Sequence, residues 1–208
     1  PTGTGKTLTA FLAFIDRFKA QAEAGELPEA LCVIYVSPLK SLAADIRENL
    51  KRPNEGIAGP QLRMAMRTGD TTSYERQKML THPPHILITT PESLYLLLTS
   101  PRSRKMLRTA QAVIVDEMHA LIGTKRGAHL MLSLARLDEL CGRRLQRIGL
   151  SATIQPLQCA ADYLAYPSPC RIVAPEIRKG KEIRVLSPLP DLRAVQGTIW
   201  PDIARQVY

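Results

Sequence analysis

The first seven residues, PTGTGKT, combine glycines, a lysine and a hydroxyl in an order that suits phosphate binding. They match all but the first position of the motif G-x-x-x-x-G-K-[ST], whose glycines let backbone N–H groups wrap a phosphate beside the positive end of a helix. In such a loop Lys6 reaches the β- and γ-phosphates, and Thr7 places its hydroxyl on Mg²⁺. Apolar residues at helical spacing follow directly in LTAFLAFIDRF, which favours this interpretation over a chance Gly/Thr-rich turn.

A pair of carboxylates follows the apolar run AVIV further along the chain. Asp116 can hold the Mg²⁺ that Thr7 also approaches, and Glu117 is placed to orient and deprotonate the water that attacks the γ-phosphate. The alternative is a charged pair that only ends a strand. The phosphate-binding loop upstream favours the catalytic interpretation.

Hydroxyls at the end of the next apolar run lie within reach of a histidine that follows these carboxylates. The sequence SAT supplies Ser151 and Thr153, and His119 lies two residues after Glu117. We expect a hydrogen bond between His119 and this SAT motif, which would connect the nucleotide state to the neighbouring surface.

Five short apolar runs alternate with helical patterns between the first helix and about residue 165. This alternation predicts an α/β fold with a parallel sheet covered by helices on both faces. Polar motifs begin where each run stops, and they read VSPLK, RTGD, TTPES, VDEMH and LSAT. Since ligands gather at the carboxyl ends of parallel strands, we expect these motifs to meet at one edge.

Composition limits the class of protein and its partners. At 208 residues and 45% hydrophobic content, the chain can form one large domain. Its net charge of +9 suits a polyanion such as nucleic acid, although an ordinary solvated surface gives a similar balance. The four cysteines are far apart without a C-x-x-C pair, which indicates free thiols in a reducing compartment and predicts a cytoplasmic protein.

Two other features carry weaker signals. His82 and His85 flank two prolines in THPPH, which predicts a rigid turn rather than half of a metal site. The most hydrophobic stretch, residues 8–15, is too short to span a bilayer, so we expect no membrane partner.

The amino-acid composition of the chain changes near Pro175, where a basic segment of alternating polarity begins and a proline-rich segment follows. We expect residues 1–174 to form one domain, lacking the strand that should feed the phosphate loop. Residues 175–208 are expected to form a linker and the start of a second domain.

Three motifs, PTGTGKT, DEMH and SAT, together resemble the pattern of superfamily 2 helicases. Longer segments around these motifs are similar to the large helicase-related (Lhr) family of DNA helicases, including its ligase-associated branch. These segments are VSPLKSLAADI, RTGDT, PPHILITTPESLYLLL, VDEMHALIGTKRGAHL and QRIGLSAT. The resemblance extends from Pro1 to Thr153. The tail to Tyr208 resembles the start of the family's second motor domain more loosely.

This resemblance implies a RecA-like P-loop NTPase fold and an ATP-dependent motor that translocates 3′→5′ on single-stranded DNA, displaces a paired strand and acts in DNA repair. An RNA–DNA hybrid is a further expected substrate, and a second RecA-like domain would supply an arginine finger. The implied contacts to ATP are Thr2, Gly3, Thr4, Gly5, Lys6 and Thr7. Implied roles elsewhere are Mg²⁺ binding by Thr7 and Asp116, catalysis by Glu117, Asp116 and Lys6, and coupling by His119, Ser151 and Thr153.

Ten further positions match residues that line the nucleic-acid groove in this family, where hydroxyls and helix N-termini grip phosphates without reading sequence. They are Ser37, Pro38, Lys40, Arg67, Thr68, Gly69, Asp70, Thr90, Pro91 and Glu92. Two alternatives stay open: an RNA-directed motor, since nothing here reads a 2′-hydroxyl, and a nucleotide-dependent clamp that grips nucleic acid without turnover.

Overall fold

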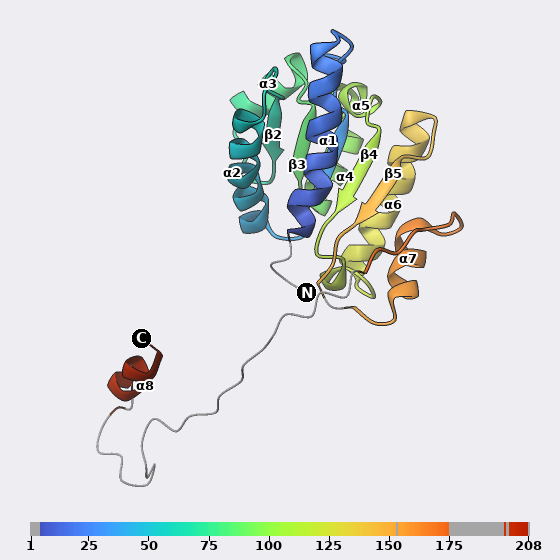
Figure 1. Cartoon of the computed structure of the whole chain (residues 1–208). Coiled ribbons are helices and arrows are strands. Elements are labelled where there is room, and N and C mark those ends of the chain that lie inside the picture. Colours follow the sequence, from blue (N-terminus) through green and yellow to red (C-terminus); the bar gives the residue numbers. More distant parts are fainter. Residues whose placement is uncertain (1–4, 153, 175–197, 199, 208) are drawn as a thin grey trace. The chain divides into compact units, whose positions relative to one another are not determined.

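The chain divides into two compact units, Pro1–Ile172 and Val173–Tyr208. A computed structural model describes residues 5–152, 154–174, 198 and 200–207 (Figure 1). The expectations for Thr2, Gly3, Thr4 and Thr153, and for most of 175–208, therefore lie outside the described residues. In the second unit the structure describes one helix, α8 (Trp200–Val207).

A five-stranded parallel sheet forms the centre of the first unit. Its spatial order is β2-β3-β1-β4-β5. The strands are β1 (Val33–Val36), β2 (Met64–Arg67), β3 (Ile86–Thr89), β4 (Ala112–Val115) and β5 (Gln146–Gly149). Their last residues lie in register across the whole sheet, so the loops that follow all five strands leave from one edge.

Helices connect successive strands and cover both faces of the sheet (Figure 1). They are α1 (Lys6–Glu23), α2 (Lys40–Gly56), α3 (Ser73–Thr81), α4 (Pro91–Thr99), α5 (Pro101–Leu107), α6 (Lys125–Cys141) and α7 (Leu157–Ala165), with a short 3₁₀ helix η1 (Met118–Ala120) after β4. Helices α1 and α2 begin at the edge where the strands end. Their N-termini therefore lie beside the loops that carry the polar motifs.

The two apolar cores follow from the period-two alternation of strand residues. In β1, Val33 and Tyr35 pack with the phenylalanines of α1 and with α2, whereas Ile34 and Val36 pack with residues of α4 to α7. Both sides of β1, β3 and β4 are thus buried, which explains why these strands appear in the sequence as continuous apolar runs.

The fold class predicted from the sequence is confirmed, and the differences concern single helices. Helix α5 was not expected, because Pro101 looks like a stop signal although proline is also favoured at the first position of a new helix. Helix α6 begins at Lys125, before the apolar run HLMLSL, because the side chain of Thr124 caps it by accepting from Gly127 N.

The structure also describes the environment of the cysteines and the length of the apolar helices. The four cysteines are free, as expected, and among them Cys32 is buried, Cys141 and Cys170 are half-buried and Cys159 is exposed. None of the described helices is both long and apolar enough to cross a membrane.

Candidate functional site

The end of the phosphate-binding loop is shaped for an anion at the start of α1. Gly5 caps this helix with φ of 75°, a left-handed conformation that a residue with a side chain adopts only at a cost. Gly5 O accepts from Thr9 N at 2.8 Å, so the helix begins at once after the glycine. The N–H groups of the first turn therefore point toward the space above Lys6 and Thr7.

The carboxylate of Asp116 is fixed by three donors from three different segments. Its Oδ2 accepts from Thr7 Oγ1 at 3.1 Å and from the Tyr35 hydroxyl at 2.5 Å. Its Oδ1 accepts from Glu117 N at 2.7 Å. Asp116 is 8% exposed, so this largely buried network joins α1, β1 and the loop after β4. Burial, and then the negative charge of Asp116, raise the pKa of Tyr35, which keeps its phenol a donor.

Thr7 and Asp116 have the chemistry of a magnesium site. Mg²⁺ prefers oxygen ligands and usually takes one or two from the protein, with water and phosphates filling the other positions. The Thr7 hydroxyl donates its hydrogen to Asp116 and keeps its oxygen lone pairs free for a cation. The donor set therefore fits Mg²⁺ bound with a nucleotide.

Glu117 has an unusual backbone, with φ of 49° and ψ of 43°, and among the described residues it is the only one besides glycine with positive φ. Such a conformation costs about 1–3 kcal/mol, and these outliers cluster at active sites. Its Oε2 lies 3.2 Å from His119 Nδ1, and Ser151 Oγ lies 3.4 Å from the same nitrogen. The structure thus brings Glu117, His119 and Ser151 into one group.

Backbone contacts hold the loop after β4 against the end of β5. Met118 N donates to Leu150 O at 3.0 Å, and Leu150 N donates to Val115 O at 2.8 Å. Gly149 allows this close approach, because an added Cβ would lie 2.1 Å from Met118 Sδ. A shift of one loop must therefore move the other.

A cleft of about 540 Å³ opens beside these groups. It is lined by Gly5, Lys6 and Thr7, by Asp116 and Glu117, by Ser151, and by one side of α2 that includes Asn49 and Arg52. Sequence reasoning missed Tyr35, Asn49 and Arg52. For Tyr35 the signal was present, since a tyrosine inside a buried strand needs a partner for its hydroxyl.

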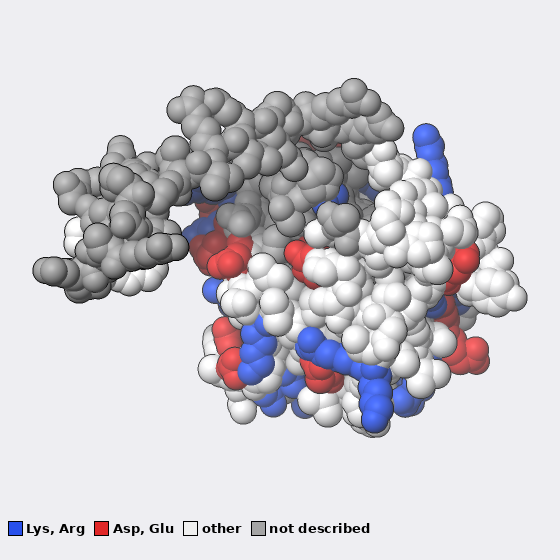
Figure 2. All heavy atoms as spheres, turned by 90° about the horizontal axis from the view of Figure 1, so that it is seen from below, with Lys and Arg blue, Asp and Glu red and all other residues white. Residues whose placement is uncertain are grey.

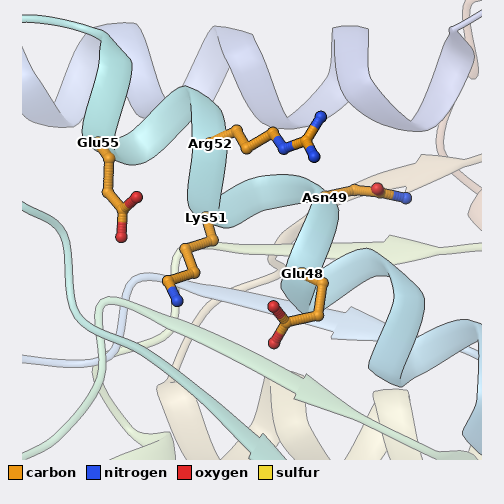
Figure 3. Close-up of a pocket in the computed structure, with 5 residues that line it drawn as sticks. All are labelled: Glu48, Asn49, Lys51, Arg52 and Glu55. Atoms are coloured by element: carbon orange, nitrogen blue, oxygen red, sulfur yellow. The ribbon is translucent and has the colours of Figure 1, made fainter.

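A second hollow, of about 390 Å³, lies on α2 alone. Figure 3 shows that Asn49 and Arg52 extend to one side of α2. The side chains of Glu48, Lys51 and Glu55 extend in a different direction. Its charged side chains are exposed and come from one helix, so this hollow has no buried polar group to hold a ligand.

Of the ten residues expected to line a nucleic-acid groove, only Lys40, Gly69, Asp70 and Glu92 are exposed. The other six are buried and act inside the domain: Ser37, Pro38, Arg67, Thr68, Thr90 and Pro91. The guanidinium of Arg67 donates to Thr68 O, and burial lowers the pKa of Arg67. Thr90 Oγ1 caps α4 by accepting from Ser93 N.

Two basic groups at the exposed members of this set, Lys40 and Arg126, are paired with acidic neighbours. Lys40 Nζ bonds both oxygens of Asp70, at 2.9 and 3.0 Å. Arg126 forms a two-bond pair with Glu92, at 2.5 and 3.0 Å, which lowers the pKa of Glu92. Figure 2, which views the molecule from below Figure 1, shows basic and acidic side chains interspersed on the described part of that face.

The two histidines of THPPH lie in different environments. His85 is 2% exposed and its Nδ1 accepts from Arg63 N at 3.0 Å, whereas His82 is exposed. Burial lowers the pKa of His85. The ring of His85 therefore supports the start of β3.

A parallel α/β sheet with a glycine-capped helix, a hydroxyl–carboxylate pair for Mg²⁺ and a second carboxylate at its carboxyl edge defines the class as a RecA-like P-loop NTPase domain. The profile of the DEAD/DEAH box helicase family matches residues 1–160. The chain belongs to this family, and within superfamily 2 to its Lhr group.

The Lhr relatives and solved structures carry that assignment. The chain is 45% identical to a Mycolicibacterium smegmatis Lhr helicase/probable uracil glycosylase over its whole length, and 49% identical, over 93% of its length, to a Methanothermobacter thermautotrophicus ATP-dependent helicase Lhr-Core. It spans 14% and 24% of those two proteins. The structure of Mycobacterium smegmatis helicase Lhr bound to ssDNA and AMP-PNP superposes with a TM-score of 0.81 at 44% identity, covering all of this chain and 27% of that one.

Proposed function

We propose that this chain is the first motor domain of an ATP-dependent DNA helicase that moves 3′→5′ on single-stranded DNA and displaces the paired strand, with a role in DNA repair. One observation carries the proposal: Thr7, Asp116, Glu117, His119 and Ser151 form one connected group beside a cleft. The Lhr relative bound to ssDNA and AMP-PNP supports both the nucleotide and the DNA.

The residues of the cleft have different roles in ATP hydrolysis. Lys6 and the first turn of α1 hold the phosphates, and Thr7 with Asp116 would hold Mg²⁺. When bound, the ion neutralises charge that develops on the phosphate oxygens. Glu117 accepts the proton of the attacking water, and His119 keeps that carboxylate in place through its Nδ1. Ser151 contacts the same nitrogen of His119, so a movement of the His119 ring changes this contact.

We propose that residues 1–174 form this domain, completed by an upstream strand, and that 175–208 lead into a second RecA-like domain. A cytoplasmic location is supported by the four free cysteines. An RNA–DNA hybrid is a further proposed substrate.

The test of the function is strand displacement by the full-length protein. We expect ATP-dependent unwinding of a DNA duplex with a 3′ single-stranded tail, and about tenfold less or none with a 5′ tail. Matched RNA duplexes test the RNA-directed alternative, and faster unwinding of RNA would favour it. Tight nucleotide-dependent DNA binding without phosphate release would show the clamp instead.

The Lys40–Asp70 pair predicts how DNA affinity responds to charge. Both side chains are exposed, 57% and 77%, so the pair contributes only about 0–1 kcal/mol and a DNA phosphate can replace Asp70. We expect Lys40→Ala to reduce the magnitude of the log–log salt slope of single-stranded DNA binding by about 0.7, the loss of one phosphate contact. Asp70→Asn should raise affinity up to about fivefold.

Lys51→Ala is the matched control, because it removes the same charge from an exposed position at the other end of α2, about 16 Å along the helix. It should leave the salt slope unchanged. If Lys51→Ala and Lys40→Ala lowered the slope equally, the effect would come from net charge, and the contact at Lys40 would be wrong.

A further inference from the structure

Tyr35 is a buried residue of β1 whose hydroxyl has a single described partner, the carboxylate of Asp116. The side chain is 1% exposed, and its ring packs against Phe11 of α1 with centroids 5.0 Å apart. Its strand lies next to β4, with Tyr35 in register with Ile114, two residues before Asp116. The hydroxyl reaches forward from this position to Asp116 Oδ2 at 2.5 Å.

Each of the two carboxylate oxygens of Asp116 accepts hydrogen bonds from its own donors. Oδ1 is held by the backbone N–H of Glu117, and Oδ2 receives the hydroxyls of both Thr7 and Tyr35. Thr7 sits at the start of α1 beside the proposed nucleotide, so its hydroxyl must serve the cation as well. Tyr35 comes from the sheet and is 1% exposed, so its hydroxyl has no solvent to bond in place of Asp116.

We infer that Tyr35 is a positioning residue for the magnesium site, holding the Asp116 carboxylate in the orientation that binds Mg²⁺ with the nucleotide. This inference rests on the proposed function. Hydrogen bonds to metal-binding carboxylates fix their orientation, and removing such a partner typically costs 10- to 100-fold in metal affinity or activity. The loss should fall on metal affinity, because Tyr35 does not line the cleft and reaches it only through Asp116.

The test is Tyr35→Phe in the full-length protein, which removes one oxygen and keeps the ring on Phe11. Mn²⁺ binding with the non-hydrolysable analogue AMP-PNP is measured by electron paramagnetic resonance, and ATPase is measured across Mg²⁺ concentration. We expect the Mn²⁺ dissociation constant and the half-saturating Mg²⁺ concentration to rise about tenfold, with kcat recovered at saturating Mg²⁺.

Two variants separate this effect from a loosened core. Tyr163→Phe removes the other buried tyrosine hydroxyl, which has no hydrogen-bond partner among the described residues, and should change neither constant. Phe18→Leu loosens the same apolar cluster as Tyr35 without touching a hydroxyl, and should lower the thermal midpoint but leave Mn²⁺ affinity unchanged.

Unchanged Mn²⁺ affinity in Tyr35→Phe, or equal weakening by Phe18→Leu, would overturn the inference while leaving the proposed function intact. A parent protein that binds no Mn²⁺ with AMP-PNP would remove the proposed function, and the inference with it.

Discussion

Residues 1–208 alone, extended by the strand expected before Pro1, should bind MgATP weakly and hydrolyse it at a rate that single-stranded DNA does not raise. A protein that also contains the second RecA-like domain should turn over about 10³- to 10⁵-fold faster with DNA, since an arginine supplied across the cleft is worth that much in phosphoryl transfer.

The structure supplies the reason, because three arginines that follow the catalytic loop along the chain are held by other partners. Arg126 is paired with Glu92. Arg143 donates to Ala110 O at 3.0 Å, just before β4 begins and so at the far end of that strand from the catalytic loop. Arg147 pairs with Asp138 at 2.6 Å. None of these three lines the cleft.

Steady-state phosphate release with and without single-stranded DNA compares the two proteins, and fluorescent-nucleotide binding verifies that the shorter one is folded. Arg52 is the internal control, because it lines the cleft from α2. Equal DNA-stimulated turnover by the two proteins, abolished by Arg52→Ala, would mean that the arginine already lies in this chain. The two-domain mechanism would then be wrong.

The second large effect concerns Glu117. In the full-length protein Glu117→Gln should keep MgATP binding and lower kcat by about 10²-fold or more, because the amide cannot accept the proton of the attacking water. Lys6→Ala should instead weaken nucleotide binding. Single-turnover hydrolysis and nucleotide titration distinguish the two losses.

Glu55→Gln is the matched control for this change, since Glu55 is exposed on α2 outside the cleft, and it should hydrolyse ATP at the parent rate. Glu117→Gln hydrolysing ATP as fast as Glu55→Gln would show that another group is the base.

The elements of this domain could be predicted from the sequence because their signals are local. Apolar runs such as VIYV and AVIV are strands because both faces of the sheet are covered, and the polar residues that end them are placed at one edge by parallel pairing. The phosphate loop, Asp116 and Glu117 were found in the same way, since each motif keeps a fixed spacing to the strand or helix beside it.

Only the tertiary structure decided which side chains face the site and which partners they hold. Arg67 ends β2 and Lys40 begins α2 after β1, both in polar motifs at the same edge of the sheet, yet Arg67 turns inward to Thr68 O and Lys40 turns outward to Asp70. Tyr35 and Asp116 are 81 residues apart and meet only because β1 and β4 are adjacent in register. Spacing along the chain fixes a residue's element and face, whereas its hydrogen-bond partner depends on strand order, which local sequence does not encode.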